Sequence, residues 1–138
     1  MKLLYLMLTL SHSSFLRLTL TSIQSMMLLK YTTMRKGDIV LIPFPFTDLR
    51  GIKNRPALVL YVALHDVTVA FITSQLIQQE PFDVAIKPNT INGLKVDSIV
   101  KLGKIATIEK SLVIGKMGLL NSSEIATINK NLIHILGL

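Results

Sequence analysis

The chain has no cysteine and contains few acidic residues and few histidines. Its 138 residues include eight acidic residues and three histidines, against fifteen lysines and arginines. Without cysteine, disulfide frameworks, thiolate nucleophiles and cysteine-ligated zinc are excluded, and a reducing cytoplasm is permitted. The length suits one domain with a single modest core. We therefore expect one domain whose chemistry depends on side chains other than cysteine.

Familiar catalytic and metal-binding motifs are also missing. The chain contains no phosphate-loop glycine pattern, no H-E-x-x-H and no G-x-S-x-G. His12, His65 and His134 are far apart in the sequence, and none has a recognisable partner for acid/base catalysis or metal binding. The five aspartates stand singly, so their spacing builds no cage for a hard cation. The sequence predicts neither a metal site nor a cofactor.

The first 33 residues differ from the rest in composition. They contain three basic residues but no acid, glycine or proline, and they have no clean period of 2 or 3.6 residues. The apolar run 3–10 resembles the core of a signal peptide, but residues 11–14 end it without a convincing cleavage site. A membrane span needs about 20 apolar residues, and polar residues interrupt any such window. We interpret residues 1–33 as a disordered extension or as upstream sequence translated in error, and expect a domain at 34–138 beginning with Met34.

Positive charge is in excess even without the first segment. Residues 34–138 hold twelve of the basic residues and all eight acidic ones, which leaves a net charge of +4. This excess favours polyanionic partners such as RNA or DNA through long-range attraction. A basic surface that serves only solubility has the same composition, so charge alone leaves both interpretations open.

Short segments rich in β-branched residues predict a mainly β domain. Turn-forming residues separate them, including Gly37 at the start and Asn92-Gly93 in the middle, and Gly103 marks a bulge or bend. The expected strands are 38–42, 57–62, 67–73, 82–87, 98–102, 104–108 and 111–114.

The end of the chain predicts one amphipathic helix. Asn121 can cap it with Glu124 three residues later, and Gly137 ends it. Many short strands and one helix suggest a small, strongly bent β-barrel or half-open sheet closed by that helix. The apolar residues that share one helix face are Ile125, Ile128, Leu132, Ile135 and Leu136.

A candidate phosphate site lies where two neighbouring strands end. Arg55 stands at the junction of a loop and a strand, and its planar guanidinium can bind phosphate oxygens in a bidentate way. Thr73 and Ser74 end the next strand, which should run beside the first. A solvated arginine and a strand-end threonine are common, so this arrangement alone does not decide the function. The loop before Arg55 adds Arg50, Lys53 and Asn54.

Several sequence blocks, in order along the chain, carry a family resemblance. They are Gly-Asp-Ile-Val at 37–40, Pro-Phe-Pro-Phe-Thr-Asp at 43–48, Arg-Pro-Ala-Leu-Val-Leu at 55–60, Ile-Thr-Ser-Gln at 72–75, and a later block formed by 97–102, 105–112 and 115–118. With these blocks, residues 34–138 resemble the MazF/PemK family of type II toxin-antitoxin ribonucleases, and the later block is similar to the PemK-like variant.

The resemblance implies a small SH3-like barrel, a cytoplasmic homodimer and metal-independent cleavage of single-stranded RNA. It also implies a cognate antitoxin whose tail covers the active groove, and contact with DNA only through the toxin-antitoxin complex. Arg55 and Thr73 match the catalytic pair of the family. The candidate RNA-binding residues are Phe46, Thr47, Arg50, Lys53, Asn54, Ser74, Gln75, Ser98 and Lys101.

Two other functions fit the same barrel. One is a toxin that poisons a protein target such as DNA gyrase, and the other is a non-catalytic nucleic-acid-binding protein. The general base is unassigned, because arginine is a poor base. In the first loop, Phe46 can stack on a splayed base, but Phe44 and Phe46 can equally pin the loop to the core.

Overall fold

The computed structural model describes residues 34–44 and 53–138. The chain divides into two compact units, Met1–Met34 and Arg35–Leu138. All the strands and the helix that the structure describes belong to the second unit. The predictions for residues 1–33 lie outside the described residues and remain predictions. No helix in the described part of the chain combines the length and apolar character that a membrane crossing requires.

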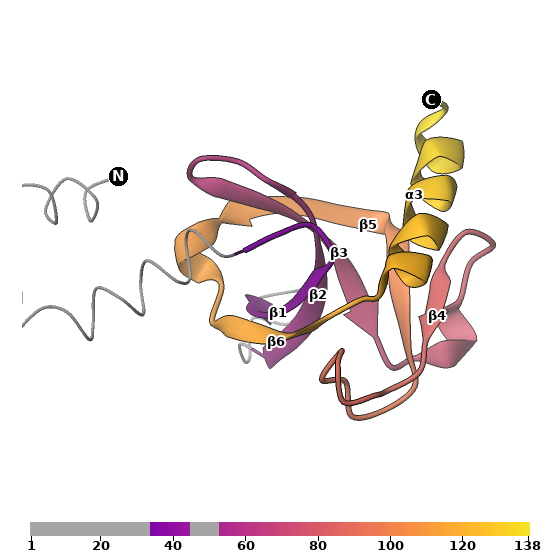
Figure 1. The fold of residues 1–138 in the computed structure, drawn as a ribbon, viewed down its shortest axis with the longest axis horizontal. Coiled ribbons are helices and arrows are strands. Elements are labelled where there is room, and N and C mark those ends of the chain that lie inside the picture. Colours follow the sequence, from indigo (N-terminus) through magenta and orange to yellow (C-terminus); the bar gives the residue numbers. More distant parts are fainter. Residues whose placement is uncertain (1–33, 45–52) are drawn as a thin grey trace, which may run out of the picture. The chain divides into compact units, whose positions relative to one another are not determined.

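Within residues 34–44 and 53–138, six antiparallel strands form one curled sheet in the order β4-β5-β3-β2-β1-β6, and one α-helix, α3, lies beside it (Figure 1). The predicted mainly β fold with one C-terminal helix is therefore confirmed. The strands are β1 (Asp38–Phe44), β2 (Lys53–Val62), β3 (Asp66–Thr73), β4 (Val84–Ile86), β5 (Ser98–Glu109) and β6 (Gly115–Leu119).

The first three strands form a meander because their apolar residues can face one core. Ile39 of β1 pairs with Leu58 of β2, and Leu58 pairs with Ala70 of β3. All three side chains are buried, so strand pairing and core packing favour the same register. The core also contains Ile72, Val84, Ile86, Leu94, Val100, Leu102, Leu120 and Ile128.

A bend at Gly103 divides β5, as the sequence predicts. Ala70 of β3 pairs with Ile105, but the next residue, Phe71, pairs with Lys101. Residues 102–104 therefore have no partner on β3, which is the pattern of a bulge. The bend gives one long strand two directions, and the sheet curls around the core (Figure 1).

The expected strand at 111–114 is wrong. A 3₁₀ turn, η2 (Lys110–Leu112), occupies its place, and β6 begins only at Gly115. The turn redirects the chain because the Lys110 amide donates to the His65 carbonyl and the Ile114 amide donates to the Leu41 carbonyl. The expected strand at 82–87 is present but shorter, as β4.

Two glycines let β6 approach the loop of residues 87–97 closely. A Cβ atom on Gly118 would lie 2.2 Å from the Ile91 carbonyl oxygen. Gly93 has a φ of +70°, and a Cβ there would lie 2.2 Å from the Met117 carbonyl oxygen. Only residues without a side chain fit these positions. The loop is therefore held against β6, with Met117 beside it.

Helix α3 (Ser122–Leu136) has the predicted capping box. The Asn121 side-chain oxygen accepts from the Glu124 amide at 2.8 Å, and the Glu124 carboxylate accepts from the Asn121 amide at 3.0 Å. Gly137 ends the helix in the left-handed conformation, as predicted. The apolar face is covered only in part. Ile128 is buried, and Ile125 and Leu132 pack against the core, whereas Ile135 and Leu136 are exposed because the last turn extends past the sheet (Figure 1).

Candidate functional site

A groove of about 390 Å³ lies where β2 begins and β3 ends. Lys53, Arg55 and Lys95 bring three positive charges to it, and none of the described residues that line it is acidic. A groove of this charge attracts anions. The lining residues are Lys53, Asn54, Arg55 and Pro56 of β2, Ile72, Thr73 and Ser74 at the end of β3, Leu94, Lys95, Val96 and Ser98, and Met117 of β6.

Strand register explains why Arg55 and Thr73 come together. Ala57 of β2 pairs with Phe71 of β3 in an antiparallel ladder. Arg55 lies two residues before Ala57, and Thr73 lies two residues after Phe71. In an antiparallel pair these positions correspond, and both side chains lie on the same face of the sheet because side chains alternate with a period of two. Both line the groove. The predicted proximity of the strand-end hydroxyl to this arginine therefore has a structural basis.

The Thr73 hydroxyl is oriented by the residue that follows its strand. Its oxygen accepts a hydrogen bond from the Gln75 amide at 3.1 Å. No atom of the described residues accepts a hydrogen bond from this hydroxyl. A hydroxyl carries one donor and two acceptor positions. Thr73 can therefore donate its proton to a ligand oxygen in the groove while Gln75 holds the oxygen in place.

Four of the predicted RNA-binding residues line the groove together with this pair. Lys53, Asn54 and Ser74 are exposed, so their polar groups are accessible to a ligand. Ser98 also lines the groove but is buried, and its hydroxyl donates to the Val96 carbonyl at 2.9 Å. The Ser98 oxygen can still accept a hydrogen bond, although its donor is already used.

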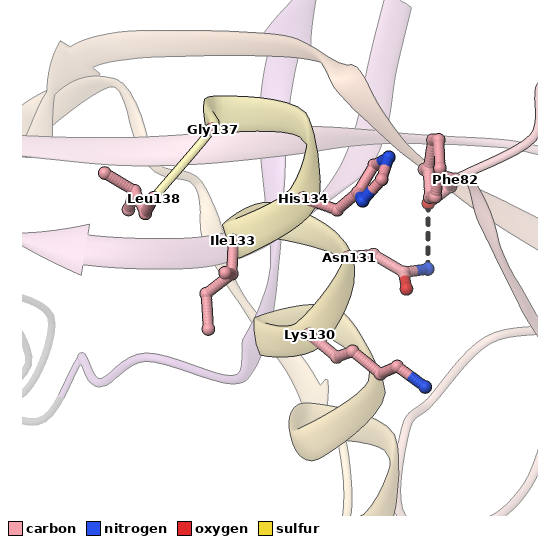
Figure 2. Close-up of a pocket in the computed structure, with 7 residues that line it drawn as sticks. All are labelled: Phe82, Lys130, Asn131, Ile133, His134, Gly137 and Leu138. Carbon is pink, nitrogen blue, oxygen red and sulfur yellow. Dashed lines mark hydrogen bonds between the residues drawn. The ribbon is translucent and has the colours of Figure 1, made fainter.

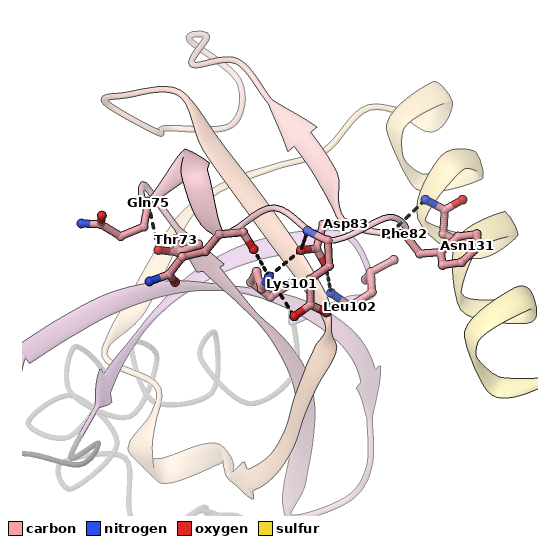
Figure 3. Close-up of polar contacts among 9 residues, drawn as sticks. Thr73, Gln75, Phe82, Asp83, Lys101, Leu102 and Asn131 are labelled. Carbon is pink, nitrogen blue, oxygen red and sulfur yellow. Dashed lines mark hydrogen bonds and ion pairs between the residues drawn. The ribbon is translucent and has the colours of Figure 1, made fainter.

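Lys101 and Gln75 do not line the groove. Only 4% of Lys101 is exposed, and its ammonium is 2.6 Å from the Asp83 carboxylate (Figure 3). The same ammonium donates to the Gln78 carbonyl and lies 3.9 Å from the Glu80 carboxylate, so it is engaged within the protein, and we omit Lys101 from the proposed ligand contacts. Gln75 is exposed, and its backbone amide affects the groove through the hydrogen bond that it donates to the Thr73 hydroxyl.

Three other candidate residues, Phe46, Thr47 and Arg50, lie outside the described residues, so their part in binding remains a prediction. Phe44, at the end of β1, is described, and its ring contacts the ring of Phe71 edge to face at a centroid distance of 4.2 Å. This contact supports the interpretation in which Phe44 anchors the start of the loop to the sheet.

The sequence did not point to the part of the groove that the loop of residues 87–97 contributes. Leu94, Lys95 and Val96 line the groove there, together with Met117 of β6. Asn92, which is fully buried, fixes this loop: its side-chain oxygen accepts from the amides of Asn89 and Leu94, and its nitrogen donates to the Lys87 carbonyl. The turn-forming residues at 88–90 and at Asn92-Gly93 were the signals in the sequence, and they indicated turns without showing what the loop faces.

A second pocket of about 450 Å³ lies along α3 (Figure 2). The His134 ring stacks on the Phe82 ring at a centroid distance of 4.1 Å, and the Asn131 side-chain nitrogen donates to the Phe82 carbonyl at 3.1 Å. None of the described side chains that line this pocket is a carboxylate. In the part of the chain that the structure describes, no three potential metal ligands gather. We therefore place the candidate site in the groove at Arg55.

Residues 35–136 match the sequence profile of a family described as PemK-like, MazF-like toxins of type II toxin-antitoxin systems. This match covers most of the chain and all of its described elements. The chain belongs to this family. A comparison with curated protein sequences gives no match.

Solved structures of MazF toxins share the fold of this toxin. The toxin MazF-mt6 of Mycobacterium tuberculosis is 24% identical, with a TM-score of 0.61 over 73% of this chain and 97% of the other. MazF of Deinococcus radiodurans is 22% identical, with a TM-score of 0.60 over 76% and 97%. A mycobacterial endoribonuclease, solved in complex with its cognate antitoxin, is 22% identical, with a TM-score of 0.59 over 76% and 96%. At these identities the likeness shows the fold.

Proposed function

We propose that this toxin is a metal-independent endoribonuclease that cleaves single-stranded RNA, with Arg55 and Thr73 as its catalytic residues. The observation that carries the proposal is the shared groove of Arg55 and Thr73, which contains two further cations and no described carboxylate. Membership of the toxin family supports the same activity, because one fold neighbour is named an endoribonuclease.

The proposed reaction uses the 2′-hydroxyl of the RNA as nucleophile. A bond forms between the 2′ oxygen and the adjacent phosphorus, and the bond from phosphorus to the 5′ oxygen breaks. The 2′-hydroxyl loses a proton and the departing 5′ oxygen gains one, so the products are a 2′,3′-cyclic phosphate and a 5′-hydroxyl end. The group that removes the first proton is unassigned.

Arg55 and Thr73 act on the charge that develops at phosphorus. The five-coordinate transition state carries more negative charge on its oxygens than the substrate does. A fixed guanidinium and a hydroxyl donor bind that state more strongly than the ground state. Arg55 supplies the permanent charge and Thr73 donates its hydroxyl proton, which the hydrogen bond from Gln75 leaves available. Losing one such donor typically lowers the rate on the order of a hundredfold.

The rest of the groove binds the RNA strand in this proposal. Lys53 and Lys95 contact phosphates, and Asn54, Ser74 and Ser98 contact sugar or base edges. Phe46, Thr47, Arg50 and Gln75 are retained as contacts on the basis of the family resemblance. In the same proposal, the toxin is a cytoplasmic homodimer inhibited by a cognate antitoxin. A fold neighbour solved with its own antitoxin supports that partner.

Cleavage in the presence of EDTA tests the proposal. The full chain is incubated with labelled single-stranded RNA, and the ends of the products are mapped. We expect defined cleavage sites with 5′-hydroxyl ends for the wild type, and loss of cleavage for Arg55→Ala and Thr73→Ala. Arg35→Ala and Thr127→Ala are matched controls, because both residues are exposed and lie outside the groove.

Each of the other functions gives a different result. Salt-sensitive binding without products would indicate a non-catalytic nucleic-acid-binding protein. Growth arrest on expression, without RNA cleavage, would indicate a protein target. Cleavage by both groove variants at the wild-type rate would overturn the assignment of Arg55 and Thr73.

A further inference from the structure

A buried ion pair joins β5 to the segment that follows Thr73. Lys101 of β5 and Asp83 are both buried, and the Lys101 ammonium is 2.6 Å from an Asp83 carboxylate oxygen (Figure 3). The same ammonium donates to the Gln78 carbonyl, also at 2.6 Å. Asp83 in turn accepts from the backbone amides of Glu80 at 2.8 Å and Leu102 at 3.3 Å. The pair thus fixes residues 78–83 to the strand.

Burial of apolar side chains does not hold the start of this segment in place. The 3₁₀ turn η1 (Leu76–Gln78) has no buried residue, and 94% of Ile77 is exposed. At the far end of the segment, Phe82 stacks on His134 of α3. A buried ion pair is itself a weak source of stability, because desolvation offsets the Coulomb attraction and an apolar pair of similar volume often does as well. What the ion pair supplies here is a fixed geometry for η1, whose side chains are not buried.

A continuous series of hydrogen bonds leads from the pair to the candidate catalytic hydroxyl. Lys101 donates to the Gln78 carbonyl, the Gln78 amide donates to the Gln75 carbonyl at 3.1 Å, and the Gln75 amide donates to the Thr73 hydroxyl oxygen at 3.1 Å. Each bond fixes the residue that makes the next one. Through η1, the Gln75 amide is thus connected to Lys101.

We infer that Lys101 and Asp83 are positioning residues, which orient the Thr73 hydroxyl through residues 75–80. The inference rests on the proposed endoribonuclease function. It gives Lys101 a role in RNA cleavage without contact to RNA, in place of the binding role that the sequence suggested. A displacement of about 1 Å at a reacting group can lower the rate on the order of a hundredfold.

A double substitution separates positioning from stability. Lys101→Met alone leaves Asp83 buried without its partner and should lower the melting temperature. Lys101→Met with Asp83→Leu removes both charges, and we expect its melting temperature to return toward that of the wild type. In the full chain, the double variant should still have a kcat on the order of a hundredfold lower in steady-state assays, with a nearly unchanged KM. Amides of Gln75, Gln78 and Gln79 should exchange faster with solvent, whereas those of β3 should not.

The control removes a second ion pair, in which Asp38 is buried and Lys116 is half-exposed. Lys116 and Asp38 join β6 to β1 with a separation of 3.2 Å, and neither hydrogen-bonds to residues 74–83. Lys116→Met with Asp38→Leu should leave the exchange of residues 75–79 unchanged. A double variant of Lys101 and Asp83 that melts like the wild type and cleaves at the wild-type rate would overturn the inference.

A second pair of variants avoids the buried charges. Gln75→Pro removes the amide that donates to Thr73, and Gln75 has a φ of −81°, which is close to the φ that proline adopts. Gln75→Ala loses the glutamine side chain, as Gln75→Pro does, but keeps the backbone N–H that donates to Thr73. We expect Gln75→Pro to have a lower kcat than Gln75→Ala, and equal kcat values would contradict the inference. Absence of cleavage by the wild type would instead overturn the proposed function.

Discussion

The side chain of Thr73 has a simple donor and acceptor balance. Its oxygen receives one hydrogen bond from the Gln75 amide, and its proton has no acceptor among the described residues. The bond from Gln75 is a local turn that threonine often makes at the end of a strand, and it leaves the hydroxyl proton available to a ligand. In the groove beside Arg55, the arrangement suits a donor to a phosphate oxygen.

A graded series at Thr73 tests this role at the scale of one residue. Thr73→Ser keeps the hydroxyl and should retain most of the cleavage rate, whereas Thr73→Val keeps the shape and should lose on the order of a hundredfold. Single-turnover rates measure the effect, and thermal melting checks that both variants fold. Equal rates for the two variants would show that the hydroxyl is not used.

The burial of Lys101 could not be predicted from its place in the sequence. It lies in a predicted strand within the block that resembles the family, so its type and position both suggested a contact to RNA. The bend at Gly103 instead brings Lys101 opposite Phe71, and its side chain is buried against Asp83. Burial of a charge depends on a partner 18 residues away in the sequence. No local pattern encodes that pairing.

At the scale of elements, the loop of residues 87–97 makes one wall of the groove because β6 lets it approach. Gly118 allows the Ile91 carbonyl to lie against the strand, and the Leu119 amide donates to that carbonyl at 3.1 Å. The Asn92 side-chain oxygen holds the loop together by accepting hydrogen bonds from two amides of the same loop. The position of Lys95 and Val96 in the groove thus depends on a glycine more than twenty residues away in the sequence.

Gly118→Ala should therefore destabilise the fold. The new Cβ would meet backbone atoms of Ile91 and Asn92 at 2.2 and 2.4 Å, and backbone cannot move aside as a flexible side chain can. We expect a loss of about 1 to 3 kcal/mol in the free energy of unfolding, measured by urea denaturation. Gly115→Ala, in the same strand, is the control. Nothing lies within 4 Å of its Cβ position, and a change within about 0.5 kcal/mol is expected.

Lys95 should contribute to RNA binding by charge alone. Lys95→Ala is expected to weaken binding of an uncleavable single strand and to reduce the slope of log affinity against log salt by about 0.7, the value for one phosphate contact. Fluorescence anisotropy over a salt series measures both. Lys104, an exposed lysine of β5 outside the groove, is the control. An unchanged slope for Lys95→Ala would exclude the contact.

The elements that the sequence predicted are those with strong local signals. β-branched runs identified β1, β2 and β3, the Asn121 and Glu124 pair marked the start of α3, and Gly103 marked the bend in β5. β6 was missed because Gly-Lys-Met-Gly-Leu has little strand propensity. One of its two glycines, Gly118, allows the approach of a distant loop. Lys95 was not recognised, because its place in the groove depends on that contact between distant parts of the sequence. Arg55 and Thr73 were recognised because they lie at the ends of two predicted neighbouring strands.

For the whole molecule, charge and fold favour the same ligand. Residues 34–138 carry a net charge of +4, and the groove concentrates three of the cations where no described carboxylate opposes them. Such a surface attracts any nucleic acid strand through its phosphates. Attraction of this kind does not distinguish RNA from DNA. The 2′-hydroxyl distinguishes them, because the proposed reaction uses it as the nucleophile.

A chimeric strand separates binding from reaction. A DNA oligonucleotide with the sequence of a mapped cleavage site should bind in the groove and inhibit RNA cleavage competitively, yet remain intact because it has no 2′-hydroxyl. The same oligonucleotide with one ribonucleotide at the scissile position should be cut there only, and the product should carry a 2′,3′-cyclic phosphate detectable by mass spectrometry. Moving the ribonucleotide one position along the strand supplies the control, and that strand should stay whole. Cleavage of the all-DNA strand would rule out attack by the 2′-hydroxyl, because its nucleophile must then come from water or from the protein.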